Sequence, residues 1–321
     1  MIHAPTLDEI CAARSRIAGD AIRTPLVRLA VDGPARIFLK LENLQPIGSF
    51  KLRGAANKLA QASDEQLARG VYTASAGNMA QGVAWCARAR GVPCSVIVPD
   101  TAPETKLAAV TRLGAAIHKV PFAEWWDVLV QRGHPRFDGQ LFVHPVSDPA
   151  VMAGNGTIGL ELLEDDLPAP PDAVIIPYGG GGLSAGIATV LRALSPRTTI
   201  YAAEVETAAP LAPALAAGAP QEVAYTPSFV DGIGGRGILA EMWPIVQPLI
   251  DGALVMSLAA IADAIRTLVE RNHVVAEGAG AAPVAAALSG QAGGTGTIVC
   301  IVSGGNIDRA KLARILVGEL P

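Results

Sequence analysis

The lysine at position 51 stands where a positive charge is usually unfavourable. It follows Gly48-Ser49-Phe50 and lies in residues 49–61, whose apolar residues share one face of a predicted helix. A cation near a helix start opposes the helix dipole, which favours anions there by a few tenths to about 1 kcal/mol. Lys51 is therefore either a solvated side chain on a helix capped by Ser49, or an amine with a chemical role.

Four consecutive glycines, Gly179 to Gly182, lie between an apolar predicted strand and a helix predicted from Leu183. Without a Cβ the backbone can approach a ligand closely, and the N–H groups of a strand-to-helix turn bind anions. The run lacks both the lysine of a P-loop and the GxGxxG spacing of dinucleotide sites. A flexible linker is the alternative, but linkers rarely join an apolar strand to an amphipathic helix. The run therefore favours a phosphate monoester.

One cofactor would use both features. Pyridoxal 5′-phosphate joins a phosphate to an aldehyde that reacts with amines. A Schiff base with Lys51 would also remove the charge that conflicts with the helix start. The sequence therefore predicts a pyridoxal-phosphate enzyme in which Lys51 is catalytic.

The composition limits the other classes of protein. The chain has 321 residues, of which 50% are hydrophobic and 17% charged, which indicates one large or two moderate α/β domains. A net charge of −4 gives no basic surface for nucleic acid. The cysteines and histidines are scattered without metal-binding spacing, so we expect no zinc site and a reducing compartment.

The first residues show no basic segment followed by an apolar one, and no run of 18 or more apolar residues occurs in the chain. We therefore expect a cytoplasmic protein without a membrane partner.

Predicted strands and helices alternate with short connections, which is typical of parallel sheets covered by helices. The first helix has Thr6 as its N-cap and Glu9 at capping-box spacing. Further strands are predicted at residues 36–42, 70–75, 94–99, 115–120, 173–178, 198–205 and 297–303, and further helices at 78–90, 103–113, 154–164, 258–272, from 183 and from 308. Residues 125–151 break the alternation and are predicted as a crossover between two lobes. The Gly- and Ala-rich residues 276–296 are predicted to be structured.

Seven segments, taken in order, carry a resemblance to a known family. They are TPLVRL, LKLENLQPIGSFKLRGA, TASAGNMAQGVA, DPAVMAGNGTIGLELL, VIIPYGGGGLSAGIA, VAEGAGAAPVAAAL and CIVSGGNID. The chain resembles, over nearly its whole length, the fold-type II pyridoxal-phosphate enzymes of the serine/threonine dehydratase and serine racemase group. Each segment alone is moderately specific, and the ordered set is far more so.

The resemblance implies a two-lobed α/β fold like that of the tryptophan synthase β subunit, with parallel-rich twisted sheets covered by helices. Residues 1–69 and 148–321 would form a large cofactor-binding domain, and residues 70–147 a small one. It also implies a homodimer.

The resemblance assigns roles residue by residue. Lys51 would form the Schiff base, Phe50 would pack beside the pyridine ring, and Asn78 would donate to the phenolic oxygen. The substrate carboxylate would be held by Ser75, Ala76, Gly77, Asn78 and Met79.

The phosphate would be held by Gly179, Gly180, Gly181, Gly182 and Leu183. Ser303 would face the pyridine nitrogen, and Gly232 and Glu277 would line the pocket. The alternatives are a plain N-cap for Ser75 and a solvated charge for Glu277.

The implied reaction is the conversion of L-threonine, L-serine or a related 3-hydroxy amino acid to a 2-oxo acid and ammonia by β-elimination. Lys51 would take the Cα proton, for which its pKa must fall by roughly three units, a cost of about 4 kcal/mol that desolvation can supply. A hydroxyl such as that of Ser303 at the ring nitrogen leaves the ring neutral, which favours elimination over transamination.

The sequence departs from the group's pattern at three places. Met79 stands where the family often has histidine. Glu204 is followed six residues later by Pro210, where racemase-like members have an aspartate that binds a divalent cation, so we predict no metal. Ala76 stands where serine racemases have the serine that serves the second face of Cα, so we expect little racemisation.

Three alternatives remain open. They are a β-replacement enzyme of the cysteine-synthase kind, a serine racemase-like enzyme, and a non-catalytic amino-acid sensor. The joint presence of Lys51, Asn78, the glycine run and Ser303 disfavours the sensor. Trp125 and Trp126 have no role in the resemblance, and core packing is their default interpretation.

Overall fold

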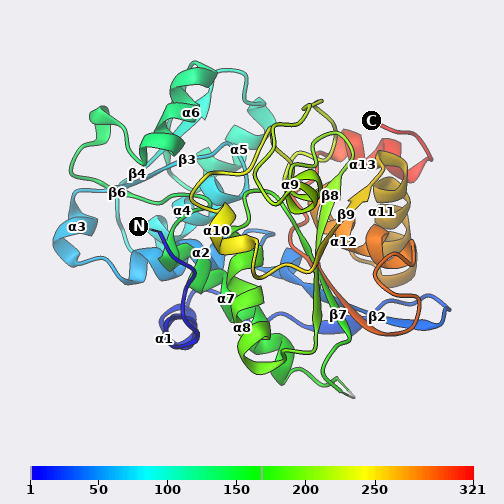
Figure 1. Ribbon diagram of the computed structural model, residues 1–321. Helices are drawn as coiled ribbons and strands as arrows, with labels where there is room; N and C mark the ends of the chain where they lie inside the picture. The colour runs from blue at the N-terminus through cyan, green and yellow to red at the C-terminus, as the bar shows by residue number, and fades with distance from the viewer. Residues whose placement is uncertain (1, 168) are drawn as a thin grey trace.

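The computed structural model describes residues 2–167 and 169–321, which form two parallel-rich sheets with helices around them (Figure 1). Within these residues the larger sheet has six strands in the order β1-β2-β10-β7-β8-β9, of which β1 is antiparallel to β2 and the other neighbours are parallel. The smaller sheet has four parallel strands in the order β5-β4-β3-β6. The predicted two-sheet α/β fold is confirmed.

The strands are β1 (Leu26–Arg28), β2 (Ala35–Leu41), β3 (Val71–Ala74), β4 (Cys94–Pro99), β5 (Ala116–Val120), β6 (Leu141–Phe142), β7 (Ala173–Pro177), β8 (Thr199–Val205), β9 (Gly252–Met256) and β10 (Gly296–Val302). The α-helices are α1 (Leu7–Ile17), α2 (Lys51–Ala60), α3 (Asp64–Ala68), α4 (Asn78–Ala89), α5 (Glu104–Arg112), α6 (Phe122–Gln131), α7 (Pro149–Glu164), α8 (Gly182–Leu194), α9 (Leu211–Ala217), α10 (Trp243–Val246), α11 (Leu258–Asn272), α12 (Gly278–Leu288) and α13 (Arg309–Leu316). Two 3₁₀ turns, η1 (Glu42–Leu44) and η2 (Pro135–Phe137), complete the described elements.

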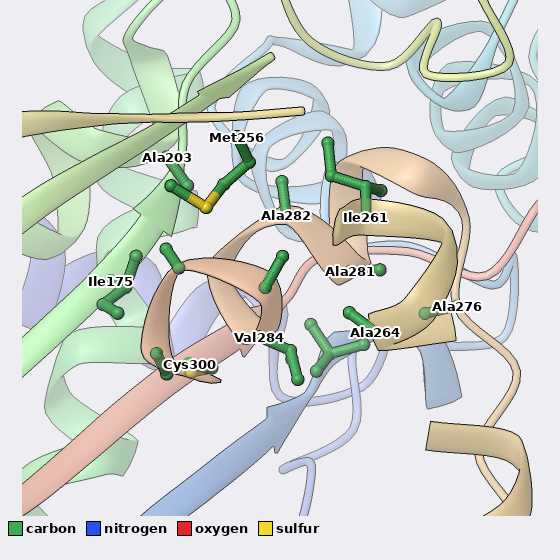
Figure 2. Close-up of a cluster of buried hydrophobic side chains, with 14 of the residues drawn as sticks. Ile175, Ala203, Met256, Ile261, Ala264, Ala276, Ala281, Ala282, Val284 and Cys300 are labelled. Atoms are coloured by element: carbon green, nitrogen blue, oxygen red, sulfur yellow. The ribbon is translucent and has the colours of Figure 1, made fainter. Parts of the chain in front are cut away.

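The core of the larger sheet is built from small side chains. Figure 2 shows Ala281, Ala282 and Val284 of α12 in one buried cluster with Ile175 of β7 and Cys300 of β10. Every residue of β7 is buried, as expected of a parallel strand that is covered on both faces. Helix α12 occupies residues 278–288, which confirms that this part of the Gly- and Ala-rich stretch is structured, as predicted.

Two predictions about individual elements were wrong. Residues 125–151 are more than a crossover, because they contain most of α6, the turn η2 and strand β6. The strand escaped prediction because it has two residues and depends on pairing with β3. Ser49 does not cap α2: the helix begins at Lys51, its N-cap is Phe50, and no side chain caps it. Ser49 instead forms a β-bridge with Gly304.

The strands of the smaller sheet lie between Val71 and Phe142. However, α2 also packs closely on α4, since a Cβ at Gly82 would lie 3.1 Å from the Lys51 carbonyl oxygen. The division into residues 1–69 with 148–321 and residues 70–147 stays a prediction. Among the described residues, no helix has the length and hydropathy needed to cross a membrane.

A buried ion network fixes α2, the helix that begins with Lys51. The guanidinium of Arg53 donates to both carboxylate oxygens of Glu42, at 2.8 Å each, and to those of Glu161 on α7 at 2.6 and 2.9 Å. Lys40 lies 3.0 Å from the same Glu161 carboxylate. Removing one member of such a network leaves a buried charge unpaired, which typically costs about 3–5 kcal/mol. The network therefore holds α2 firmly against α7 and η1.

Glycines allow α7 to approach both α2 and α8. A Cβ at Gly154 would collide with the backbone of Arg53, and a Cβ at Gly186 would lie 2.6 Å from the Gly156 nitrogen. Because α2 begins with Lys51 and α8 begins with Gly182, the last residue of the glycine run, these close approaches set the distance between the two features.

We predict that Gly186→Ala destabilises the protein by about 1–3 kcal/mol, because overpacking outweighs the roughly 1 kcal/mol gain in helix propensity. Chemical denaturation measures the change in the free energy of unfolding. Gly33→Ala is the control, since no atom lies within 4 Å of a Cβ built there. A Gly186→Ala midpoint at or above that of the natural protein would contradict the prediction.

Candidate active site

A cavity of about 460 Å³ is lined by the carboxyl ends of strands from both sheets. Ala74 and Pro99 end β3 and β4 of the smaller sheet, Pro177 ends β7 of the larger sheet, and Ser303 directly follows β10. Ligands of open parallel sheets bind outside these ends. The cavity is therefore placed where such a fold binds small molecules.

The cavity brings together all the residues that were predicted for the site. They are Phe50, Lys51, Ser75, Ala76, Gly77, Asn78, Met79, Gly179, Gly180, Gly181, Gly182, Leu183, Gly232, Glu277 and Ser303. The alternative interpretation of Ser75 as a plain N-cap is wrong, because the N-cap of α4 is Gly77. The Ser75 hydroxyl accepts from the Gly77 nitrogen at 3.3 Å. The roles assigned to these residues stay predictions.

Lys51 lies inside this cavity with its amine held. Its Nζ donates to the carbonyl oxygen of Pro145 at 2.7 Å and lies 5.1 Å from the centroid of the Phe50 ring. Burial lowers the pKa of Lys51 from 10.5 to about 8, although the negative charge of Glu277 opposes the shift. A lysine with a pKa of about 8 is neutral in about one tenth of the molecules at pH 7, and the neutral form is the nucleophile and base.

The start of α2 is tied to the end of β10 through the backbone. Phe50 N donates to the Ser303 carbonyl at 3.0 Å, and Gly305 N donates to the Gly48 carbonyl at 2.9 Å. A Cβ at Gly304 would lie 2.6 Å from Oε1 of Glu277, so a side chain at residue 304 would displace this carboxylate. Lys51 and Ser303 therefore share one rigid junction.

A chain of side-chain amides orients Asn78. Nδ2 of Asn306 donates to Oδ1 of Asn78 at 2.8 Å, and Nδ2 of Asn78 donates to Oε1 of Glu277 at 2.8 Å. The amide of Asn78 keeps a second N–H for a ligand. Sequence reasoning missed Asn306, although it lies in the SGGN segment that also supplied Ser303.

The glycine run forms a tight turn before α8. Gly181 has φ +91°, and Cβ atoms at Gly180 and Gly182 would lie 2.5 Å from Cγ1 and 2.7 Å from the carbonyl oxygen of Val146. The first N–H groups of a helix have no intrahelical partner, and they attract anions together with the helix dipole. The turn is therefore shaped for an anion such as a phosphate.

Residues 144–147 support both the amine and the glycine run. Nδ1 of His144 accepts from Val146 N at 3.1 Å and from Ser147 N at 2.9 Å. The Ser147 hydroxyl donates to Glu241 at 2.9 Å and accepts from Arg132 at 2.8 Å. Burial, with the nearby charge of Arg132, lowers the pKa of His144 to about 4, so the ring is neutral and can accept. Sequence reasoning gave this histidine no role.

Further lining residues were also missed. They are Ala74, Pro99, Thr101, Ala102, Pro103, Phe122, Trp125, Leu129, Pro145, Val146, Pro177, Asp231, Ile233 and Ala279. The residues after β4 could have been predicted, because ligands bind beyond the carboxyl ends of parallel strands. The residues of α6 could not, because this helix was not predicted. The prediction of core packing is wrong for Trp126, whose side chain is 44% exposed. Trp125 lines the cavity.

Glu204 lies apart from the residues that line the cavity. Its two carboxylate oxygens accept from Leu211 N and Ala212 N at 2.8 Å each, and burial raises its pKa to about 7. No group of three or more His, Cys, Asp or Glu residues within the described ranges could hold a metal ion.

Residues 17–304 match the family described as "Pyridoxal-phosphate dependent enzyme". The chain belongs to this family. It is 37% identical to L-threonine ammonia-lyase of Thermotoga maritima over 316 residues, which are 97% of this chain and 78% of the relative. It is 36% identical to L-threonine dehydratase catabolic TdcB of Staphylococcus aureus over 324 residues, which are 98% of this chain and 92% of the relative.

Solved structures of similar proteins have the same fold. Maize serine racemase gives a TM-score of 0.86 at 33% identity, with 98% of this chain and 99% of that chain covered. A threonine deaminase from the organism abbreviated T.th. gives a TM-score of 0.87 at 37% identity, with 95% of this chain and 99% of that chain covered.

The residues of the cavity fit pyridoxal 5′-phosphate. The glycine turn lies so close to Val146 that Gly180 and Gly182 have no room for a Cβ, and Lys51 is a buried amine with a lowered pKa. When bound, this cofactor withdraws electrons from the amino acid and so acidifies its Cα–H bond.

We predict that the neutral state of His144 makes stability depend on pH. The folded pKa lies below the unfolded value of 6.5, so the unfolded state binds more protons and stability falls as the pH drops from about 6.5 to 4. The loss is about 3 kcal/mol. His144→Asn, which keeps an acceptor but cannot titrate, is expected to flatten this part of the stability–pH curve.

Denaturant melts between pH 4 and 7 measure the effect. The exposed His3, replaced by Asn in the same way, controls for the loss of a histidine. Equal slopes for the natural protein and His144→Asn would show that the ring is not held neutral.

Proposed function

We propose that the protein is a pyridoxal-phosphate-dependent ammonia-lyase that converts L-threonine, or another L-3-hydroxy amino acid, to a 2-oxo acid and ammonia. The observation that carries the proposal is the meeting of Lys51, the glycine turn and the N-terminus of α4 around one cavity. Relatives named L-threonine ammonia-lyase, 37% and 43% identical, support the reaction and the substrate class.

The substrate carboxylate is proposed to bind at the start of α4. Residues 75–79 line the cavity there, and the first N–H groups of that helix lack intrahelical partners. The carboxylate orients the amino acid, so that its Cα–H bond lies toward Lys51. Asn78 is proposed to hold the cofactor's phenolic oxygen with its second N–H, and Phe50 to pack beside the ring.

The amine of Lys51 is proposed to hold the cofactor aldehyde and, once released, to take the Cα proton. With a pKa of about 8, roughly half of the free amine is neutral at pH 8. The same group can then give its proton to the β-hydroxyl, which leaves as water. Ser303 is proposed to face the ring nitrogen with a hydroxyl rather than a carboxylate, which favours elimination.

The remaining site roles follow the same assignment. Gly179–Leu183 are proposed to bind the phosphate, and Gly232 and Glu277 to line the pocket beside the cofactor. We also propose a cytoplasmic homodimer. The four cysteines, which are all free, support the cytoplasmic location. Exposed apolar side chains such as Leu44 and Val275 support the homodimer, and a hydrogen bond from Asn43 to the Val275 carbonyl joins their two segments.

Lys51→Ala is expected to abolish 2-oxo acid release from L-threonine and L-serine. The loss should exceed the 10²–10⁴-fold typical of a general base alone, because the residue also holds the cofactor. The visible absorption band of the lysine-bound cofactor should disappear as well. Lys58→Ala is the control, because Lys58 lies on the same helix and pairs with Asp148 at 2.8 Å outside the cavity. Retained 2-oxo acid formation in Lys51→Ala would overturn the assignment.

A racemase is the second candidate, because maize serine racemase is 33% identical. Inversion at Cα needs a proton donor on the face opposite Lys51, and Ala76, in the loop that lines the cavity, has no proton to give.

We therefore expect the protein to release 2-oxo acid from L-serine with little inversion, and Ala76→Ser to increase inversion. Incubation in D₂O followed by chiral chromatography measures D-serine against 2-oxo acid. D-serine accumulating in the natural protein as fast as 2-oxo acid would refute this prediction.

A further inference from the structure

We propose that Phe122, Trp125 and Leu129 of α6 form the wall that receives the Cβ substituent of the substrate. The inference rests on the proposed function and deepens it. The protein would then select L-3-hydroxy amino acids whose substituent is uncharged and apolar, and it would reject those with a second carboxylate.

Other parts of the cavity already have occupants under the proposed function. The amine and the cofactor lie at Lys51, the substrate carboxylate at residues 75–79, and the phosphate at residues 179–183. What is left for the substituent includes the segment after β4 and the face of α6, namely Thr101, Ala102, Pro103, Phe122, Trp125 and Leu129. All of these side chains are uncharged.

The face of α6 that lines the cavity is apolar and includes two aromatic rings; Leu129 is buried, and the side chain of Phe122 is 56% exposed. Residues 122, 125 and 129 follow the three- and four-residue spacing of one helix face. The rings of Phe122 and Trp125 have centroids 5.5 Å apart. Trp126, the neighbour of Trp125, does not line the cavity. The two adjacent tryptophans therefore have different environments, and Trp126 is a matched control for Trp125.

The charges around the cavity disfavour a second carboxylate. Within the described residues, its charged lining side chains are Lys51, Asp231 and Glu277. Lys51 is assigned to the cofactor and the Cα proton, and the other two are acidic. A substrate carboxylate placed against α6 would meet one buried donor without a partner in the described residues, Nε1 of Trp125, but no cation, which is unfavourable for a charge that has lost water.

The expected selectivity has a definite size. One methylene in a hydrophobic pocket changes kcat/KM by about 10–200-fold, so L-threonine is expected to exceed L-serine by about 10-fold or more. 3-Hydroxyaspartate is expected to be the poorest of the three substrates.

The first experiment measures kcat/KM of the holoenzyme for L-serine, L-threonine and L-3-hydroxyaspartate in the natural protein and four variants. Phe122→Ala and Trp125→Ala should each lower the threonine-to-serine ratio, by about 10-fold. Trp126→Ala should leave the ratio unchanged. Trp125→Arg should raise 3-hydroxyaspartate relative to threonine by about 10-fold, because it supplies the missing cation.

A second experiment reads binding without turnover. L-2-Aminobutyrate, which lacks a β-hydroxyl, should change the tryptophan fluorescence of the holoenzyme at lower concentration than L-aspartate. The change should disappear in the conservative variant Trp125→Phe and persist in Trp126→Phe.

The outcomes separate the two proposals. If no substrate yields a 2-oxo acid, the proposed function fails. If L-threonine reacts but 3-hydroxyaspartate is equally good, or if the ratios in the Phe122 and Trp125 variants match that of Trp126→Ala, the inference about α6 is wrong.

Discussion

The site depends on the backbone junction between the start of α2 and the end of β10. Phe50 donates to the Ser303 carbonyl and Gly305 donates to the Gly48 carbonyl, at 3.0 and 2.9 Å. These bonds join segments that are far apart in the chain, and they leave Lys51 at a helix start without a side-chain cap. The larger sheet therefore positions the amine directly, and the network around Arg53 prevents the helix from shifting.

Burial and charge act on Lys51 in opposite directions, and burial dominates. The pKa falls to about 8 although Glu277 favours the charged form. Glu277 also accepts from Asn78. The same carboxylate therefore limits the fall in the pKa of Lys51 and orients the Asn78 amide. His144 also contributes, because it accepts from Val146 N and so fixes the turn that presents the Pro145 carbonyl to Nζ of Lys51. The chemistry of the amine is thus a property of three separate segments.

The sequence by itself determined the features that depend on local chemistry. Thr6 and Glu9 predicted the capping box of α1, and the structure confirms it. The alternation of strands and helices predicted parallel sheets. Helices cover both faces of such a sheet, so its strands are apolar along their whole length. The glycine run and Lys51 predicted the cofactor of the family to which the chain belongs, because a tight anion-binding turn and a misplaced cation are visible without any long-range contact.

Only the tertiary structure decided which distant residues complete the site. Asn306, Gly304 and His144 gain their importance from partners in other segments, and although the SGGN segment contains the first two, it does not show which side chains they meet. The pair Trp125 and Trp126 shows the same limit, because core packing was the default interpretation of both residues. One lines the cavity and the other is 44% exposed. Adjacent residues on a helix point about 100° apart, so their roles separate only when the helix packs against the sheet.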